Sequence, residues 1–264
     1  MNKEIKFALY AIKKNIQNGA ELRGSFLLNI FGMAINNIAF IFLWIYFIKS
    51  VGVIGGWTAP DIIGLQVFVS ISYGLVFSCA MGIRKIPEYV SSGAFDRYLL
   101  SPKNLLIRIA TASFNASAIG DLLYGLVCFA VYAILISITF YQFWMMLVLI
   151  IFAMIALLAM TILIGASSFF FTDPQAVTAG FFDLFFTPSM FHGGAFQGAL
   201  RFVFTFIIPS LVIGTLPAEA VRSLSFSKLA LVGILSFVWL FISIKFFNYA
   251  IKKYESTNFM TFGN

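Results

Sequence analysis

Polar side chains inside long apolar runs are the residues of this sequence whose types could do chemistry. Asp121 lies near the start of one uncharged run, Asp183 lies midway along another, and Asn36 and Asn37 lie in a third. Charged side chains are costly in hydrocarbon, so they usually face the interior of a helix bundle or a water-filled cavity. These four residues are therefore candidates for a translocation path or for polar contacts between helices.

The pattern leaves the role of each candidate open. For Asp183, a place on a substrate path and a bond to a buried donor are equally compatible with the sequence. For Asp121, a structural or water-facing role is favoured over contact with a substrate. Side-chain amides such as those of Asn36 and Asn37 more commonly form hydrogen bonds between membrane helices than line a cavity.

Motifs for catalysis, nucleotide hydrolysis or metal binding are missing. The nearest approach to the phosphate-binding loop GxxxxGK(S/T) is GAELRGS at 19–25, which has no lysine. The single histidine, His192, stands beside two glycines and is interpreted as structural, and Cys79 and Cys128 as small buried hydrophobes. We therefore expect no catalytic residue, no metal and no cofactor in this chain.

The composition indicates an all-α integral membrane protein. Of 264 residues, 61% are hydrophobic and 10% are charged, whereas about a quarter of a soluble domain is charged. The net charge of +7 comes from short basic clusters beside apolar runs. Such clusters are typical of topology signals and of contact with anionic membrane lipid, so nucleic acid is not an expected partner.

The elements expected to position these residues form one permease-like domain over residues 1–264. Residues 1–24 should form an interfacial helix, because their apolar residues recur at spacings of three or four. Six runs are long enough to cross a bilayer, for which about 20 residues are needed. These spans are expected at about 25–48, 62–82, 109–138, 145–170, 175–191 and 229–251.

Residues 193–222 are expected to form a re-entrant hairpin on the extracellular side rather than another span. Pro209, Gly214 and Pro217 interrupt their apolar stretch, and broken backbone at membrane depth must be shielded by protein or water. With this assignment, most of the 17 lysines and arginines lie on one side of the membrane. The positive-inside rule makes that side cytoplasmic and places both termini there.

The loop 83–108 carries the stretch PEYVSSGAFDRYLLSP at 87–102. Pro87 can begin a helix and Pro102 ends the element, so we predict one short amphipathic helix parallel to the membrane. Both a helix resting on the membrane and a docking surface for another protein fit this pattern. The predicted apolar stripe consists of Tyr89, Val90, Phe95 and Leu99.

The same run, YVSSGAFDRYLLSPKNLL, resembles the first cytoplasmic loop of ABC-2 type transporter permeases, in the branch related to viologen and multidrug exporters. That branch carries a segment of the form IxxGx(L/F)DxxLLxP between spans two and three. The pair Gly56–Trp57 and the late stretch TPSMFHGGAFQGALRFVFTFIIPSLVIGTLPAEA also match, with Thr187 where tyrosine is common. The matching loop residues are Gly93, Phe95, Asp96, Leu99, Leu100 and Pro102.

The resemblance implies a type V exporter-like permease, with a coupling helix and a re-entrant hairpin before the last span. Such permeases pair with a second permease, in a homodimer or a heterodimer, and recruit two separately encoded ATP-binding cassette ATPase subunits. ATP and Mg would then bind to those partners. By resemblance, the coupling helix would bury its apolar anchors in an ATPase groove, and the implied coupling residues are Pro87, Glu88, Tyr89, Gly93, Phe95, Asp96, Arg97 and Leu99.

The sequence thus predicts the permease subunit of an ATP-driven exporter in the plasma membrane of a bacterium. Its expected substrate is an amphipathic molecule that is drug-like, peptide-like or lipid-like. The alternative is a secondary transporter or channel driven by an ion gradient, with Asp121 and Asp183 as ion-linked groups. A membrane-embedded lipid enzyme is disfavoured, because no His, Asp and Glu cluster forms near one interface.

Overall fold

The computed structural model describes residues 3–51, 55–100 and 102–255, and it contains helices and no strand in these ranges. Five helices are long and apolar enough to cross a membrane, with mean hydropathies between 1.9 and 3.2. The predicted all-helical, multi-pass membrane protein is therefore confirmed. The long helices are α2 (Arg23–Val51), α3 (Ala59–Cys79), α8 (Ser117–Leu135), α9 (Phe140–Ser167) and α13 (Phe226–Ala250).

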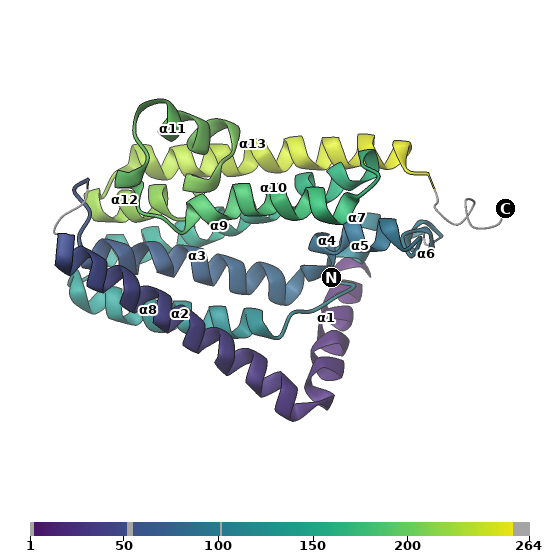
Figure 1. Ribbon diagram of the computed structural model, residues 1–264, viewed down its shortest axis with the longest axis horizontal. Helices are drawn as coiled ribbons and strands as arrows, with labels where there is room; N and C mark the ends of the chain where they lie inside the picture. Colours follow the sequence, from purple (N-terminus) through teal and green to yellow (C-terminus); the bar gives the residue numbers. More distant parts are fainter. Residues whose placement is uncertain (1–2, 52–54, 101, 256–264) are drawn as a thin grey trace.

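Helix α10 (Pro174–Ser189) occupies most of the predicted fifth span and runs alongside the long helices (Figure 1). Its 16 residues extend about 24 Å at 1.5 Å per residue, which is less than the roughly 30 Å of a bilayer core. The helix is therefore short for a complete crossing. The count of six spans stays a prediction.

The two ends of the bundle carry different elements (Figure 1). We call them the α1 end and the α12 end. The α1 end holds α1 (Lys3–Glu21), α4 (Met81–Arg84), α5 (Ile86–Ser91), α6 (Asp96–Leu99), α7 (Leu105–Ala110), η1 (Ser168–Phe170) and η5 (Ile251–Lys253). The α12 end holds η2 (Gly193–Ala195), α11 (Gly198–Phe202), η3 (Val203–Ile207), η4 (Ser210–Val212) and α12 (Thr215–Ser223).

Helix α1 lies across the bundle end, transverse to the long helices (Figure 1). No residue of α1 is buried, and Leu9 and Tyr10 are more than half exposed. The Asn15 side chain donates a 2.7 Å hydrogen bond to the Thr111 carbonyl, and the Lys103 ammonium lies 3.7 Å from the centre of the Phe7 ring. The structure describes a helix over Lys3–Glu21, and its position in the membrane interface stays a prediction.

The predicted third span, 109–138, starts too early. Helix α7 ends at Ala110, and α8 begins only at Ser117. The Asn115 carboxamide oxygen accepts hydrogen bonds from the Ser117 amide at 3.1 Å and from its hydroxyl at 2.7 Å. This local side-chain bonding offers the backbone an alternative to a continuous helix.

The fourth span, predicted from 145, begins earlier, at Phe140. Thr139 and Gln142 form a capping box at this point, and their side chains satisfy backbone amides that the first helical turn leaves unpaired. Residues 140–144, which the prediction left outside the span, therefore belong to the helix.

Helix α3 is the central helix, since 78% of its most apolar window is buried. Its close neighbour α8 approaches through small residues, as membrane helices commonly do. A Cβ added at Gly74 would lie 2.7 Å from the Leu122 side chain, and one at Gly125 would lie 2.7 Å from the Ile71 side chain. Both positions therefore require glycine for this helix separation.

A substitution at Gly82, in α4, tests the close contact between α4 and α7. A Cβ at this position would overlap the carbonyl oxygen of Ile109, which belongs to rigid backbone. We expect Gly82→Ala to destabilise the protein by about 1–3 kcal/mol, the usual cost of overpacking. Thermal unfolding of the detergent-solubilised chain measures this, with Gly180→Ala as the control because no atom lies within 4 Å of a Cβ there. Equal unfolding temperatures for Gly82→Ala and Gly180→Ala would contradict the close contact between α4 and α7.

Candidate functional site

The loop 83–108 folds into separate short helices, so the prediction of one helix over 87–102 is wrong. Helix α5 ends at Ser91, and Gly93 adopts a left-handed conformation with φ of 68°. The Phe95 amide then donates a 2.9 Å hydrogen bond back to the Tyr89 carbonyl. Glycine tolerates this conformation without strain, so Gly93 reverses the chain before α6 begins.

Phe95 lies inside the protein and is 0% exposed. Its ring centre lies 4.9 Å from that of Tyr254 and 5.0 Å from that of Phe169. The Tyr254 hydroxyl donates a 2.8 Å hydrogen bond to the neighbouring Asp96 carboxylate. This group, which we call the Phe95 cluster, also contacts the ends of α9 and α13 through Ala166 and Phe247.

The predicted apolar stripe therefore faces this chain rather than a partner. Tyr89 and Val90 are 8% and 7% exposed, and with Phe95 they cannot serve as anchors in a partner's groove. Tyr89 and Val90 lie on α5 before the reversal at Gly93, and Phe95 follows it. Of the predicted stripe, only Leu99 is exposed, at 46%.

Two tyrosines and two arginines stabilise the turn between α5 and α6. The Tyr89 and Tyr98 rings lie 5.2 Å apart, and the Arg97 guanidinium lies 5.1 Å from the centre of the Tyr98 ring. Arg108 donates a 3.0 Å hydrogen bond to the Tyr98 carbonyl. Burial above all, and then the neighbouring Tyr98 and Glu88, raises the pKa of Tyr89, so its phenol stays neutral at physiological pH.

Four of the residues that remain exposed on this segment form what we call, after its predicted role, the coupling surface: Glu88, Arg97, Leu99 and Leu100. Leu100 is 87% exposed, which is unusual for a leucine next to a buried cluster. Pro87 is buried and Asp96 is half-buried. The surface thus combines one carboxylate, one guanidinium and two leucines, a mixture suited to a protein partner.

The four intramembrane candidates separate into one pair and two single residues. The Asn37 side chain, on α2, donates a 2.7 Å hydrogen bond to the Asp121 carboxylate on α8. Both residues are buried, at 8% and 4% exposure. Asn36 and Asp183 lie instead on exposed faces of α2 and α10.

The segment between α10 and α13 is buried only in part, because α11 has no buried residue. Helix η3 is a π-helix, and Pro209, Gly214 and Pro217 behind it are all buried. A Cβ at Gly214 would lie 2.8 Å from both the Ser189 carbonyl oxygen and the Val69 side chain. The interrupted backbone at 209–217 is thus shielded by protein, and the re-entrant hairpin over 193–222 stays a prediction.

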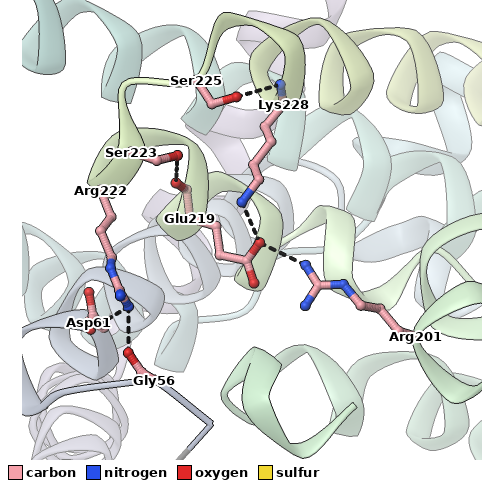
Figure 2. Close-up of polar contacts among 8 residues, drawn as sticks. All are labelled: Gly56, Asp61, Arg201, Glu219, Arg222, Ser223, Ser225 and Lys228. Atoms are coloured by element: carbon pink, nitrogen blue, oxygen red, sulfur yellow. Dashed lines mark hydrogen bonds and ion pairs between the residues drawn. The ribbon is translucent and has the colours of Figure 1, made fainter. Parts of the chain in front are cut away.

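Two ion-pair groups hold this segment at the α12 end (Figure 2). Glu219 accepts hydrogen bonds from Arg201 at 2.7 Å and from Lys228 at 2.8 Å. Arg222 donates to the Asp61 carboxylate at 3.0 Å and to the Gly56 carbonyl at 2.7 Å. The first group links α11, α12 and α13, and the second links α12 to the start of α3.

Glu219 is ionised in this arrangement. Burial alone would raise the pKa of Glu219, but hydrogen bonds and charge from Arg201 and Lys228 outweigh it, so the pKa lies below its ordinary range. The carboxylate therefore stays charged at neutral pH and joins three helices.

The sequence contained a local signal for one of these groups. Thr58-x-x-Asp61 before an apolar run is a capping pattern, and Thr58 does donate to Asp61 through its amide at 2.8 Å and its hydroxyl at 2.7 Å. Arg222 lies 161 positions away along the chain, so no local pattern could pair it with Asp61. The sequence pattern predicts only a role in topology for the cations at this end.

His192 packs between two tryptophans, with ring centres 5.6 Å from Trp44 and 6.2 Å from Trp57. It is 4% exposed, and burial lowers its pKa. Within the described ranges, no group of three or more His, Cys, Asp or Glu residues could hold a metal ion.

A double-mutant cycle on Asn37→Ala and Asp121→Ala measures the intramembrane pair. Interhelical hydrogen bonds in membranes contribute about 0.6 kcal/mol on average, so we expect a coupling free energy of about 0.5–1.5 kcal/mol. Asn36→Ala provides the control for Asn37→Ala, because Asn36 is exposed on the same helix. Additive losses of stability would show that the bond does not join α2 to α8.

Glu219→Gln should lower the free energy of unfolding at neutral pH by about 1 kcal/mol. This value is modest because the Arg201 and Lys228 side chains are 38% and 36% exposed, so water screens their charges. A carboxylate with a lowered folded pKa stabilises the protein fully above its unfolded pKa of about 4.3. That contribution is lost as the pH falls through the lower folded pKa.

The unfolding temperatures of wild type and Glu219→Gln should therefore converge in strong acid. The exposed Glu21→Gln is the matched control and should follow the wild type at every pH. A difference between wild type and Glu219→Gln that is independent of pH would argue against the ionised network.

Comparison with known protein families matches residues 34–258 to the family described as ABC-2 family transporter protein. Curated proteins and solved structures provide no match. The matched range covers most of the chain and includes the coupling surface, the Phe95 cluster and both ion-pair groups. The chain therefore belongs to the ABC-2 family transporter proteins, and it is the membrane-embedded permease subunit of an ABC transporter.

Proposed function

We propose that this permease is the six-span membrane subunit of an exporter that ATP hydrolysis on a separate subunit drives. The observation that carries the proposal is the coupling surface, because its exposed residues adjoin buried ones along the chain. Leu99 and Leu100 directly follow Tyr98, which packs in one buried group with Phe95. A partner that binds Leu99 and Leu100 could therefore pull on the ends of α9 and α13. Family membership supports an ATPase partner, because ABC-2 permeases typically work with one.

The α1 end is the proposed cytoplasmic end. Its basic residues outnumber those of the α12 end, which supports this orientation by the positive-inside rule. They include Lys3, Lys6, Lys13, Lys14, Arg23, Arg84, Lys85, Arg97, Lys103, Arg108, Lys245, Lys252 and Lys253. Both termini would then be cytoplasmic, in the plasma membrane of a bacterium.

Two ATPase subunits, each binding ATP and Mg, would act on two permeases, which are either identical or different. Closure of the ATPases would bring the two coupling surfaces together and tilt the helices attached to them. Glu88 and Arg97 are exposed and can pair with opposite charges on the ATPase surface.

The segment 193–222 would close the path on the outer side as a re-entrant hairpin. Its ion pairs to Asp61 and Lys228 are only partly buried, so they can break and reform at modest cost. Outward opening would then require separation of α12 from α3 and α13.

An apolar cavity of 250 Å³ between α9, α10 and α13 supports an amphipathic, drug-like, peptide or lipid-like substrate. Its lining contains no charged residue and includes Met160, Phe181, Phe185 and Trp239. Asp183 lies on the exposed face of the same helix as Phe181 and would meet a polar part of the substrate only outside this cavity.

Leu99→Ser combined with Leu100→Ser tests the coupling surface. Both side chains are exposed, so the variant should insert and unfold like wild type, but it should bind the ATPase at least about tenfold more weakly, as expected when central apolar contacts are removed. Leu22→Ser is the control, because it is 74% exposed at the same end of the bundle.

The measurement is recovery of a Walker-motif ATPase with the tagged permease from its native membrane. Loss of the ATPase with the double variant, and retention with the control, is the expected result. Repeated recovery of the wild-type chain alone, with transport that survives ATP depletion but not loss of an ion gradient, would contradict the proposal and favour a secondary transporter or channel.

A further inference from the structure

A cavity of 160 Å³ opens at the α1 end, between the α4–α5 turn and the facing sides of α9 and α10. Since a water molecule occupies about 30 Å³, this space can hold several waters or a phosphate group. Its polar lining is Arg84, Lys85, Glu88, Thr161, Gln175 and Thr178. The hydroxyls of Thr161 and Thr178 donate to carbonyls of their own helices, so the donors left for a ligand come from the other residues.

Arg84 is held in place without a carboxylate. One of its terminal nitrogens donates a 2.8 Å hydrogen bond to the Tyr73 hydroxyl, and its guanidinium carbon lies 4.0 Å from the centre of the Phe182 ring. In the part of the chain that the structure describes, no acidic group lies within ion-pair distance of Arg84 or Lys85. A guanidinium has five N–H donors, and among the described residues only one of those of Arg84 has a hydrogen-bond partner, the Tyr73 hydroxyl.

Arg84 is half-buried, which makes an unpaired positive charge costly. The aromatic contact orients the planar guanidinium, and such a fork matches the oxygens of a phosphate group. Lys85 adds a second charge, while Glu88 removes one, so the lining keeps a formal charge of +1. The site is therefore shaped and charged for a small anion.

We propose that this cavity binds a phosphate-type anion, from either the headgroup of an anionic phospholipid or free phosphate in the adjacent solution. The bound anion would join Arg84 of α4 to the α10 face that carries Gln175. At present the two sides are joined by the 2.7 Å hydrogen bond from Gln175 to Ser91 and by the contact between Arg84 and Phe182. This inference is independent of the proposed export function.

Native mass spectrometry of the full-length chain in neutral detergent tests the lipid source. The probes are dioleoylphosphatidylglycerol and dioleoylglycerol, which has the same acyl chains but no phosphate. We expect one saturable phosphatidylglycerol adduct that Arg84→Gln weakens about tenfold, the effect of losing a hydrogen bond to a charged group. Lys245→Gln is the control, because Lys245 is an exposed cation near the same end on α13.

Inorganic phosphate tests the soluble source. If free phosphate is the ligand, it should raise the unfolding temperature of wild type and of Lys245→Gln, but not that of Arg84→Gln. An Arg84-dependent effect of either probe supports the site and identifies its source. The absence of any Arg84-dependent effect with both probes would overturn the proposal.

Arg84→Gln also removes the bond to Tyr73, so this variant could fail to fold. Lys85→Gln then tests whether the cavity binds the anion, because this variant leaves the contacts of Arg84 with Tyr73 and Phe182 in place. The same loss of anion binding in Lys85→Gln supports the site, and binding at wild-type strength would overturn it.

Discussion

The burial of Phe95 is the constraint on which the arrangement of the α1 end depends. Its ring fills the space between Phe169, which follows α9, and Tyr254, which follows α13. Because Gly93 reverses the chain just before it, the same turn that buries Phe95 exposes Leu99 and Leu100. Burying an aromatic side chain contributes about 1.5–3 kcal/mol, so this contact is strong enough to keep the coupling surface attached to the bundle.

Two long helices connect this cluster to the ion pairs at the opposite end. The first turn of α13 carries Lys228, which binds Glu219. Its last turn carries Phe247 and Ala250, which belong to the same buried group as Phe95. Helix α9 begins beside Gln142, whose side chain donates a 3.2 Å hydrogen bond to the Val221 carbonyl of α12. A displacement of the coupling surface would therefore reach α12 along both helices.

Much of the fold could be predicted from the sequence, because a membrane helix needs only a long apolar run. Whether the Phe95 side chain faces this chain or a partner could not be predicted. The apolar stripe that contains Phe95 fits a partner's groove and the protein's own helix ends equally well. The pairing of Asn37 with Asp121 and of Asp61 with Arg222 depends on how distant helices pack, which no local spacing encodes. The predicted helix starts near Asn115 and Thr139 differ from the structure because local side-chain hydrogen bonds form there, and hydropathy does not record them.

We expect the coupling surface to move as one body with the end of α13. Spin labels at Arg97 and Lys252, both exposed, would measure this in the complete transporter after replacement of Cys79 and Cys128. We expect the same distance between the labels with and without ATP and Mg. A distance that changes by several ångströms when ATP binds would show that the Phe95 cluster does not hold the two parts together.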